Sequence, residues 1–128
     1  RLLAARNELS GTLPTELGAL SSITHFQVFR NALSGTLPSE LGSWVAVKDF
    51  RLGDNVFTGT LPTQLGAWTS IELFAMNSCA LTGTLPSEIG RWKPLRFFSV
   101  SSNAFGGQLP AQLGEWTDLT DFFAYNNA

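Results

Sequence analysis

The sequence has few of the residues that mark many protein classes. Cysteine occurs once, at Cys79, so no disulfide can form within the chain. Charged residues make up only 14% of the chain and the net charge is −2, which leaves neither a basic surface for nucleic acid nor an acidic tail. No apolar run approaches the roughly 18 residues that span a bilayer. A hydrophobic share of 44% over 128 residues nevertheless excludes a disordered chain and indicates one folded domain.

A six-residue pattern recurs five times without insertion or deletion. In its second copy it reads Leu-Ser-Gly-Thr-Leu-Pro, and each copy starts 24 residues after the one before it. The copies are Leu9 to Pro14, Leu33 to Pro38, Phe57 to Pro62, Leu81 to Pro86 and, in altered form, Phe105 to Pro110. A fixed period of this length is typical of a repeat protein, in which each copy packs only on its neighbours.

Aligning the sequence at this period gives columns of apolar residues. One column is aromatic: Phe26, Phe50, Phe74, Phe98 and Phe122. A second apolar column follows two residues later, and this alternation predicts one short strand in each repeat, around residues 25–29 and their equivalents, with both columns facing the interior. A third column consists of Leu20, Trp44, Trp68, Trp92 and Trp116. We expect these large rings to fill the core.

The rest of each repeat predicts turns. A glycine present in every copy (Gly11, Gly35, Gly59, Gly83 and Gly107) indicates a backbone position that needs positive φ or close approach. The flanking threonines favour a second short extended segment. The proline, the polar residues after it and a second glycine predict one short helical or 3₁₀ turn.

A polar column follows each predicted strand: Asn7, Asn31, Asn55, Cys79, Asn103 and Asn127. Side-chain amides at this bend can satisfy backbone groups that the turn leaves unpaired, so stacked copies would form an asparagine ladder. Cys79 is only a weak donor, and we expect the ladder to be poorer there.

The combined pattern, L/W-x-x-L-x-x-F-x-L-x-x-N-x-L-x-G-x-L-P-x-x-L-G-x, resembles the plant-type, 24-residue class of leucine-rich repeats. The resemblance implies a right-handed α/β solenoid with a parallel sheet on the concave face, short turns or 3₁₀ helices on the convex face and short second strands at L-x-G-x. Residues 1–128 would form one array of five repeats and a partial one. No capping module is recognisable at either end, so we expect an internal segment of a longer protein, or ends covered by partner molecules.

The same resemblance implies a non-enzymatic recognition domain, extracellular or at the cell surface, that binds a protein, peptide or glycan. The expected site is the variable concave column: His25, Gln27, Phe29, Arg30, Asp49 and Arg51 in early repeats, with Phe97, Phe123 and Tyr125 in late ones. Exposed aromatic residues beside arginines are typical of interface anchors.

Other functions have less support in the sequence. No combination of Ser, His, Asp or Cys converges on a catalytic or metal site, and no cofactor is implied. His25 and Asp49 fall at the same register of adjacent strands, about 5 Å apart, which is close enough for a salt bridge but gives too few ligands for a metal. Two alternatives remain: a structural component of a surface coat or fibre, and ice binding through the stacked Ser/Thr-Gly-Thr segments.

Overall fold

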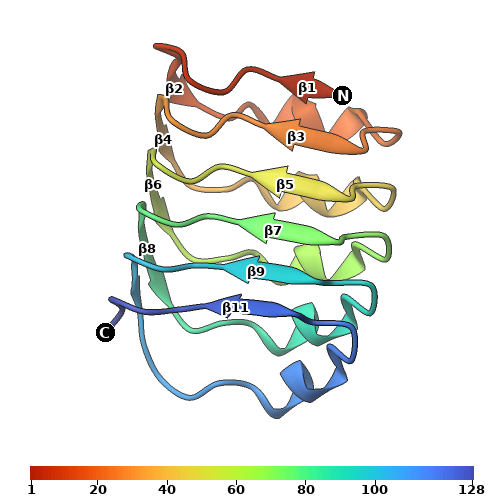
Figure 1. Ribbon diagram of the computed structural model, residues 1–128. Helices are drawn as coiled ribbons and strands as arrows, with labels where there is room; N and C mark the ends of the chain where they lie inside the picture. The colour runs from red at the N-terminus through yellow and green to blue at the C-terminus, as the bar shows by residue number, and fades with distance from the viewer.

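The computed structural model describes residues 1–128, which form a solenoid of stacked repeats (Figure 1). Each repeat supplies one strand to a six-stranded parallel sheet of order β1-β3-β5-β7-β9-β11. These strands are β1 (Leu2–Leu3), β3 (His25–Gln27), β5 (Asp49–Arg51), β7 (Leu73–Ala75), β9 (Phe97–Ser99) and β11 (Asp121–Phe123). Each internal strand begins where the sequence predicts it and ends two residues earlier.

A second parallel sheet runs along one flank, in the order β10-β8-β6-β4-β2. Its strands are β2 (Ser10–Thr12), β4 (Ala32–Gly35), β6 (Val56–Gly59), β8 (Ala80–Gly83) and β10 (Ala104–Phe105). The chain then enters the 3₁₀ turns η1 (Thr15–Ala19), η2 (Ser39–Ser43), η3 (Thr63–Ala67), η4 (Ser87–Arg91) and η5 (Ala111–Glu115). The predicted second strands and helical turns are therefore confirmed.

The two sheets differ in register. In the six-stranded sheet each residue pairs with its equivalent 24 positions on, such as Phe26 with Phe50. In the second sheet the partner lies 22 positions on, so Thr12 pairs with Ser34. The chain bends between the two sheets at a residue with positive φ, which is 57° at Arg30 and 54° at Asp54. The Ser and Thr hydroxyls on this flank are therefore staggered from rung to rung.

Aromatic rings fill the core along its whole length. Phenylalanines 24 residues apart stack on one another, with 5.4 to 5.8 Å between ring centroids. Trp44, Trp68 and Trp92 are fully buried, which confirms their expected place in the core. A buried indole needs a hydrogen-bond acceptor. Each Nε1–H donates to a backbone carbonyl in the 3₁₀ turn of the preceding repeat. The distance from Trp68 Nε1 to the Leu41 carbonyl oxygen is 2.8 Å. Each ring therefore joins two repeats both by packing and by a hydrogen bond.

Each helix is a five-residue 3₁₀ turn, far short of the length and apolarity that a membrane-crossing helix needs.

The glycines of the second sheet have the positive φ that the sequence predicts, between 76° and 84°. Except at Gly11, they also leave space for a threonine of the preceding repeat. A Cβ built on Gly59 would lie 2.8 Å from Cγ2 of Thr36, whereas a Cβ on Gly11 would meet nothing within 4 Å. The threonine methyl groups therefore have a packing role between repeats.

This difference gives a matched test of repeat packing. Gly11→Ala introduces only the strain of positive φ, which costs roughly 1–2 kcal/mol. We expect Gly59→Ala to lower the free energy of unfolding by about 1–3 kcal/mol more, because the new methyl overpacks against Thr36. Urea denaturation of both variants measures the difference.

The control is a double variant. Thr36→Ser removes the methyl group that Gly59→Ala would meet, so the cost of Gly59→Ala should fall towards that of Gly11→Ala in this background. Equal costs for Gly59→Ala in both backgrounds would contradict this packing role.

Candidate functional site

The predicted site residues lie on the outward face of the six-stranded sheet, which we call the concave face. Side chains alternate along each strand, so the buried phenylalanines leave three rows pointing outward. The first row is His25, Asp49, Leu73, Phe97 and Asp121, and the second is Gln27, Arg51, Ala75, Ser99 and Phe123. The third, just beyond the strands, is Phe29, Gly53, Asn77, Ser101 and Tyr125.

Contacts divide the predicted residues into two groups. Around β3 and β5, Gln27 Nε2 donates to Asp49 Oδ2 at 2.9 Å, and Arg30 Nε lies 3.4 Å from Asp54 Oδ2. Near the C-terminus, Phe97 and Phe123 pack at 5.5 Å between centroids, and Tyr125 meets Phe123 edge-on at 6.4 Å. The first group is polar and the second aromatic.

His25 and Asp49 do not form the salt bridge that their spacing allows. The two residues are register partners, but the Asp49 carboxylate accepts two hydrogen bonds from Arg51, both at 2.8 Å. His25 Nδ1 instead lies 2.9 Å from Thr24 Oγ1. Arg51 is on the same strand and the same face, and its planar guanidinium matches both carboxylate oxygens.

Not all of the aromatic residues are as exposed as the sequence predicts. Phe123 and Tyr125 are 39% and 63% exposed, but Phe29 and Phe97 are half-buried. Phe97 is covered in part because it packs against Phe123. Ser99 and Ser101, which belong to the second and third rows, are buried.

A hollow of about 260 Å³ lies in the middle of the concave face. Its lining comprises Phe29, Arg51, Gly53, Asp54, Leu73, Ala75, Asn77 and Phe97. We call it the central hollow. Large side chains stand at its rim, and the floor is low because Gly53 and Ala75 are small. Strand alternation puts Gly53, Ala75 and Asn77 in the outward rows, but none of them is among the predicted site residues. The sequence signal for this hollow is the presence of small residues beside large ones in the outward rows.

A second hollow of about 330 Å³ adjoins the first at the start of the strands. It is lined by His25, Lys48, Asp49, Glu72, Leu73, Arg96 and Phe97, so it shares Leu73 and Phe97 with the central hollow. Lys48 Nζ lies 3.3 Å from Glu72 Oε1. The two hollows together make a depression along the strands, charged at one end and more apolar at the other.

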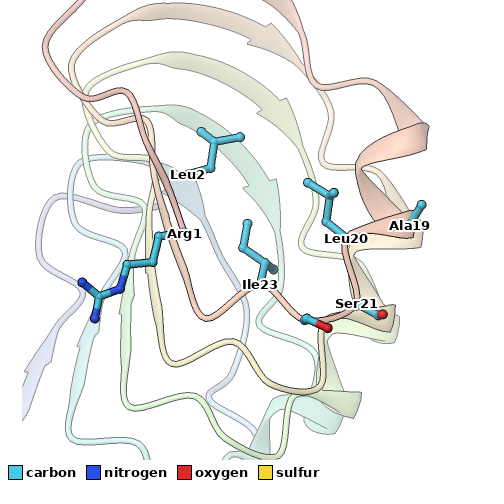
Figure 2. Close-up of a pocket in the computed structure, with 7 residues that line it drawn as sticks. Arg1, Leu2, Ala19, Leu20, Ser21 and Ile23 are labelled. Carbon is cyan, nitrogen blue, oxygen red and sulfur yellow. The ribbon is translucent and has the colours of Figure 1, made fainter.

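A larger hollow, of about 480 Å³, lies at the first repeat (Figure 2). Leu2, Leu20 and Ile23 point towards it from different segments of the chain. The equivalents of Leu20 and Ile23 in the second repeat are the buried residues Trp44 and Val47. The hollow is thus lined by side chains whose equivalents in the second repeat pack against a neighbouring repeat. We assign it no ligand.

The asparagine column makes regular hydrogen bonds to the backbone. Asn55 Nδ2 donates to the carbonyl oxygens of Val28 and Leu52 at 3.0 and 2.9 Å, and its Oδ1 accepts from the Leu33 N–H at 2.9 Å. Equivalent bonds are made by Asn31, Asn103 and Asn127, while Asn7 bonds only within its own repeat. The amides of Asn31, Asn55, Asn103 and Asn127 therefore join adjacent repeats by fixing a bend of the backbone.

Cys79 makes only weak contacts at the same position. Its Sγ lies 3.8 Å from the carbonyl oxygens of Leu52 and Asn77. Burial raises the pKa of the thiol, and backbone hydrogen bonds lower it by less. A protonated, half-buried thiol is a poor nucleophile. No group of three or more His, Cys, Asp or Glu side chains could hold a metal ion.

We expect Cys79→Asn to stabilise the protein. An asparagine would donate to the backbone as its equivalents do, which is worth about 1 kcal/mol of unfolding free energy. The gain should increase above pH 9. The folded thiol titrates above its ordinary pKa of 9.0, so the wild-type protein loses stability as the pH rises past that value and the variant does not. Denaturation at pH 7 and pH 10 measures both effects. A less stable variant at pH 7 would contradict the ladder's energetic role.

Solved structures similar to this chain are ectodomains of plant receptors. The Arabidopsis receptor kinase HAESA, in complex with the peptide hormone IDA and the co-receptor SERK1, has a TM-score of 0.95 at 28% identity over 99% of this chain and 21% of its own. The Arabidopsis receptor kinase GASSHO1/SCHENGEN3, in complex with CASPARIAN STRIP INTEGRITY FACTOR 2, has 0.93 at 30% identity, over 98% of this chain and 15% of its own. The receptor kinase SOBIR1 from Arabidopsis thaliana has a TM-score of 0.93 at 25% sequence identity. The match covers 99% of this chain and 68% of SOBIR1.

The chain spans about a fifth or less of the length of HAESA and GASSHO1/SCHENGEN3. No protein-family model matches the sequence, and no curated protein matches it significantly. The 24-residue signature, the two parallel sheets joined by 3₁₀ turns and these structural likenesses agree with one another. The chain is a leucine-rich-repeat solenoid of the plant type, in a version rich in phenylalanine and tryptophan.

Proposed function

We propose that this chain is a non-enzymatic, extracellular recognition module that binds a peptide or protein ligand on its concave face. The central hollow is the observation that carries the proposal. A flat sheet face would give a ligand no fixed position, whereas a hollow with an aromatic and polar rim can hold one side chain in place. Aromatic and arginine side chains at a binding surface contribute most of the affinity in known interfaces.

The class of ligand is supported by the similar structures. One is described as a plant peptide hormone receptor, RGFR1, in complex with RGF2, and HAESA is in complex with a peptide hormone. The present chain shares their architecture, and its concave face has both apolar and hydrogen-bonding groups suited to a peptide. The same likeness supports the proposed position outside the cell.

The test is the loss of binding in the double variant Phe29→Ala/Arg51→Ala. A linear heptapeptide library displayed on phage would be selected on the wild-type protein, and the enriched peptides synthesised and titrated by calorimetry. We expect the double variant to weaken binding at least 100-fold, because both residues line the central hollow. Circular dichroism and urea denaturation verify that the variant is folded.

The matched control removes one apolar side chain and one arginine from the opposite side of the solenoid. Val45 and Arg91 are exposed near η2 and on η4, so Val45→Ala/Arg91→Ala should keep the wild-type affinity. Unchanged binding in the Phe29→Ala/Arg51→Ala variant would exclude the concave face as the site.

A further inference from the structure

The central hollow contains an asparagine, Asn77, whose side-chain carboxamide has no hydrogen-bond partner in the chain. Asn77 is half-buried, and its side chain makes no hydrogen bond, unlike the ladder asparagines. Gly53, on the preceding repeat, has no positive φ and no turn that would require glycine. A Cβ at Gly53 would lie 2.6 Å from Asn77 Oδ1. The absence of a side chain at Gly53 therefore lets the Asn77 carboxamide lie against the neighbouring repeat at the floor of the hollow.

A second polar group without a partner lies one repeat further on. Ser101 is 2% exposed, and its hydroxyl oxygen has no hydrogen-bond partner. It is the third-row equivalent of Asn77, so about 4.8 Å separates their backbones. Buried polar groups are almost always hydrogen-bonded, and an unpaired one costs roughly 1–3 kcal/mol. The Ser101 hydroxyl is too deeply buried to meet a ligand, so the half-buried Asn77 carboxamide is the group that can bind the N–H and C=O groups of a peptide backbone.

The charges around the hollow determine which side chain can enter it. Both arginines nearby are already paired with carboxylates of this chain: Arg51 with Asp49 and Arg30 with Asp54. A ligand carboxylate or phosphate would have to compete with these pairs, and a ligand cation would meet the arginines. The floor at Ala75 is apolar, and Leu73 and Phe97 border it. The hollow thus favours an uncharged, apolar side chain.

We propose that the central hollow is the specificity subsite of the binding face, and that it takes one apolar side chain of an extended, locally uncharged peptide segment. The segment's side chain lies over Ala75 between Phe29 and Phe97, and its backbone amide bonds to Asn77. This subsite rests on the proposed function, since it requires that the concave face binds a peptide. Ala75 and Gly53 define its depth, and Asn77 fixes the backbone of the segment.

The experiment uses the heptapeptides selected on the wild-type protein. Ala75→Phe fills the hollow, and Ala75→Val fills it partly if the larger side chain disturbs folding. Both should weaken binding, Ala75→Phe at least tenfold, and Asn77→Leu, which keeps the shape of the side chain, should also weaken it at least tenfold. Ala80→Phe is the matched control, because Ala80 is exposed on β8 in the second sheet. It should bind as the wild type does.

Ser101→Ala separates this buried hydroxyl from the subsite. Removal of an unpaired buried hydroxyl should raise the unfolding free energy of the free protein. The affinity for the peptide should not change, because the hydroxyl is out of the ligand's reach. In the peptide, replacing the apolar residue that the selected sequences share with Asp should weaken binding at least tenfold.

The outcomes separate the subsite from the proposed function. If selected peptides lose binding to Phe29→Ala/Arg51→Ala but bind Ala75→Phe, Ala75→Val and Asn77→Leu normally, the concave face is the site and the subsite is wrong. If they bind Phe29→Ala/Arg51→Ala normally, both proposals fail. A library that yields no binding peptide also contradicts both.

Discussion

Trp68→Ala is expected to lower the free energy of unfolding by about 3–5 kcal/mol, the range for truncating a fully buried large aromatic residue. Trp68 is 0% exposed and packs between aromatic rings of both neighbouring repeats. Its centroid lies 4.8 Å from that of Phe50 and 5.7 Å from that of Trp92, to which it is nearly parallel at 13°. Truncation would leave a cavity that the stacked rings on either side cannot fill without breaking their own contacts.

The hydrogen bond of Trp68 contributes less than its packing. The Leu41 carbonyl oxygen that accepts from Nε1 also accepts from the Trp44 N–H, so it keeps a partner in the variant. We therefore expect most of the loss from the cavity. Urea denaturation followed by circular dichroism measures it, and an unchanged m-value would show that the same cooperative unit unfolds.

Trp116→Ala is the comparison for this prediction. Trp116 is 5% exposed and packs against the Trp92 and Phe98 rings of the preceding repeat and the Phe122 ring that follows it. Its loss should cost less than the loss of Trp68. A cost of under about 1 kcal/mol for Trp68→Ala would contradict the view that the tryptophan column holds the repeats together.

Asn55→Ala is expected to cost about 3 kcal/mol, although its side chain is small. The substitution leaves the buried Leu33 N–H without an acceptor, and it leaves the Leu52 carbonyl with only the weak Cys79 thiol contact at 3.8 Å. Each buried group left unpaired costs roughly 1–3 kcal/mol. The Val28 carbonyl keeps a donor, since it also accepts from Asn31. The same denaturation experiment measures the loss.

Cys79→Ala is the matched control, because Cys79 occupies the same position one repeat further on and makes only two long contacts. Its cost should be under about 1 kcal/mol, since little hydrogen bonding is lost. Equal costs at the two positions would show that the side-chain amide is not what stabilises the bend.

The periodicity of the sequence predicted the fold well because its columns report burial directly. A phenylalanine present in every repeat must face inward, and a glycine present in every repeat has the positive φ that Gly59 shows. The two-residue stagger of the second sheet could not be read from these columns. It depends on how the backbone bends at residues such as Arg30, where ordinary side chains adopt positive φ.

The candidate site was less accessible to sequence reasoning. Aligning the repeats in columns identified which residues face outward. It could not show that Asp49 pairs with Arg51 on its own strand and not with His25 on the neighbouring strand. The central hollow depends on the volume that Gly53 and Ala75 leave empty, and neither residue has a functional group that marks it as part of a site. Sites made by missing volume become visible only when the neighbouring side chains are placed.

Chemical-shift mapping by NMR tests most directly whether the concave face binds the ligand. The isotope-labelled protein would be titrated with a selected heptapeptide, and the backbone amide shifts followed for every repeat. We predict that the largest changes lie at Phe29, Gly53, Ala75 and Asn77, with small changes along the second sheet and the 3₁₀ turns. Largest changes on β4, β6 and β8, or on η2 to η4, would contradict the assignment of ligand binding to the concave face.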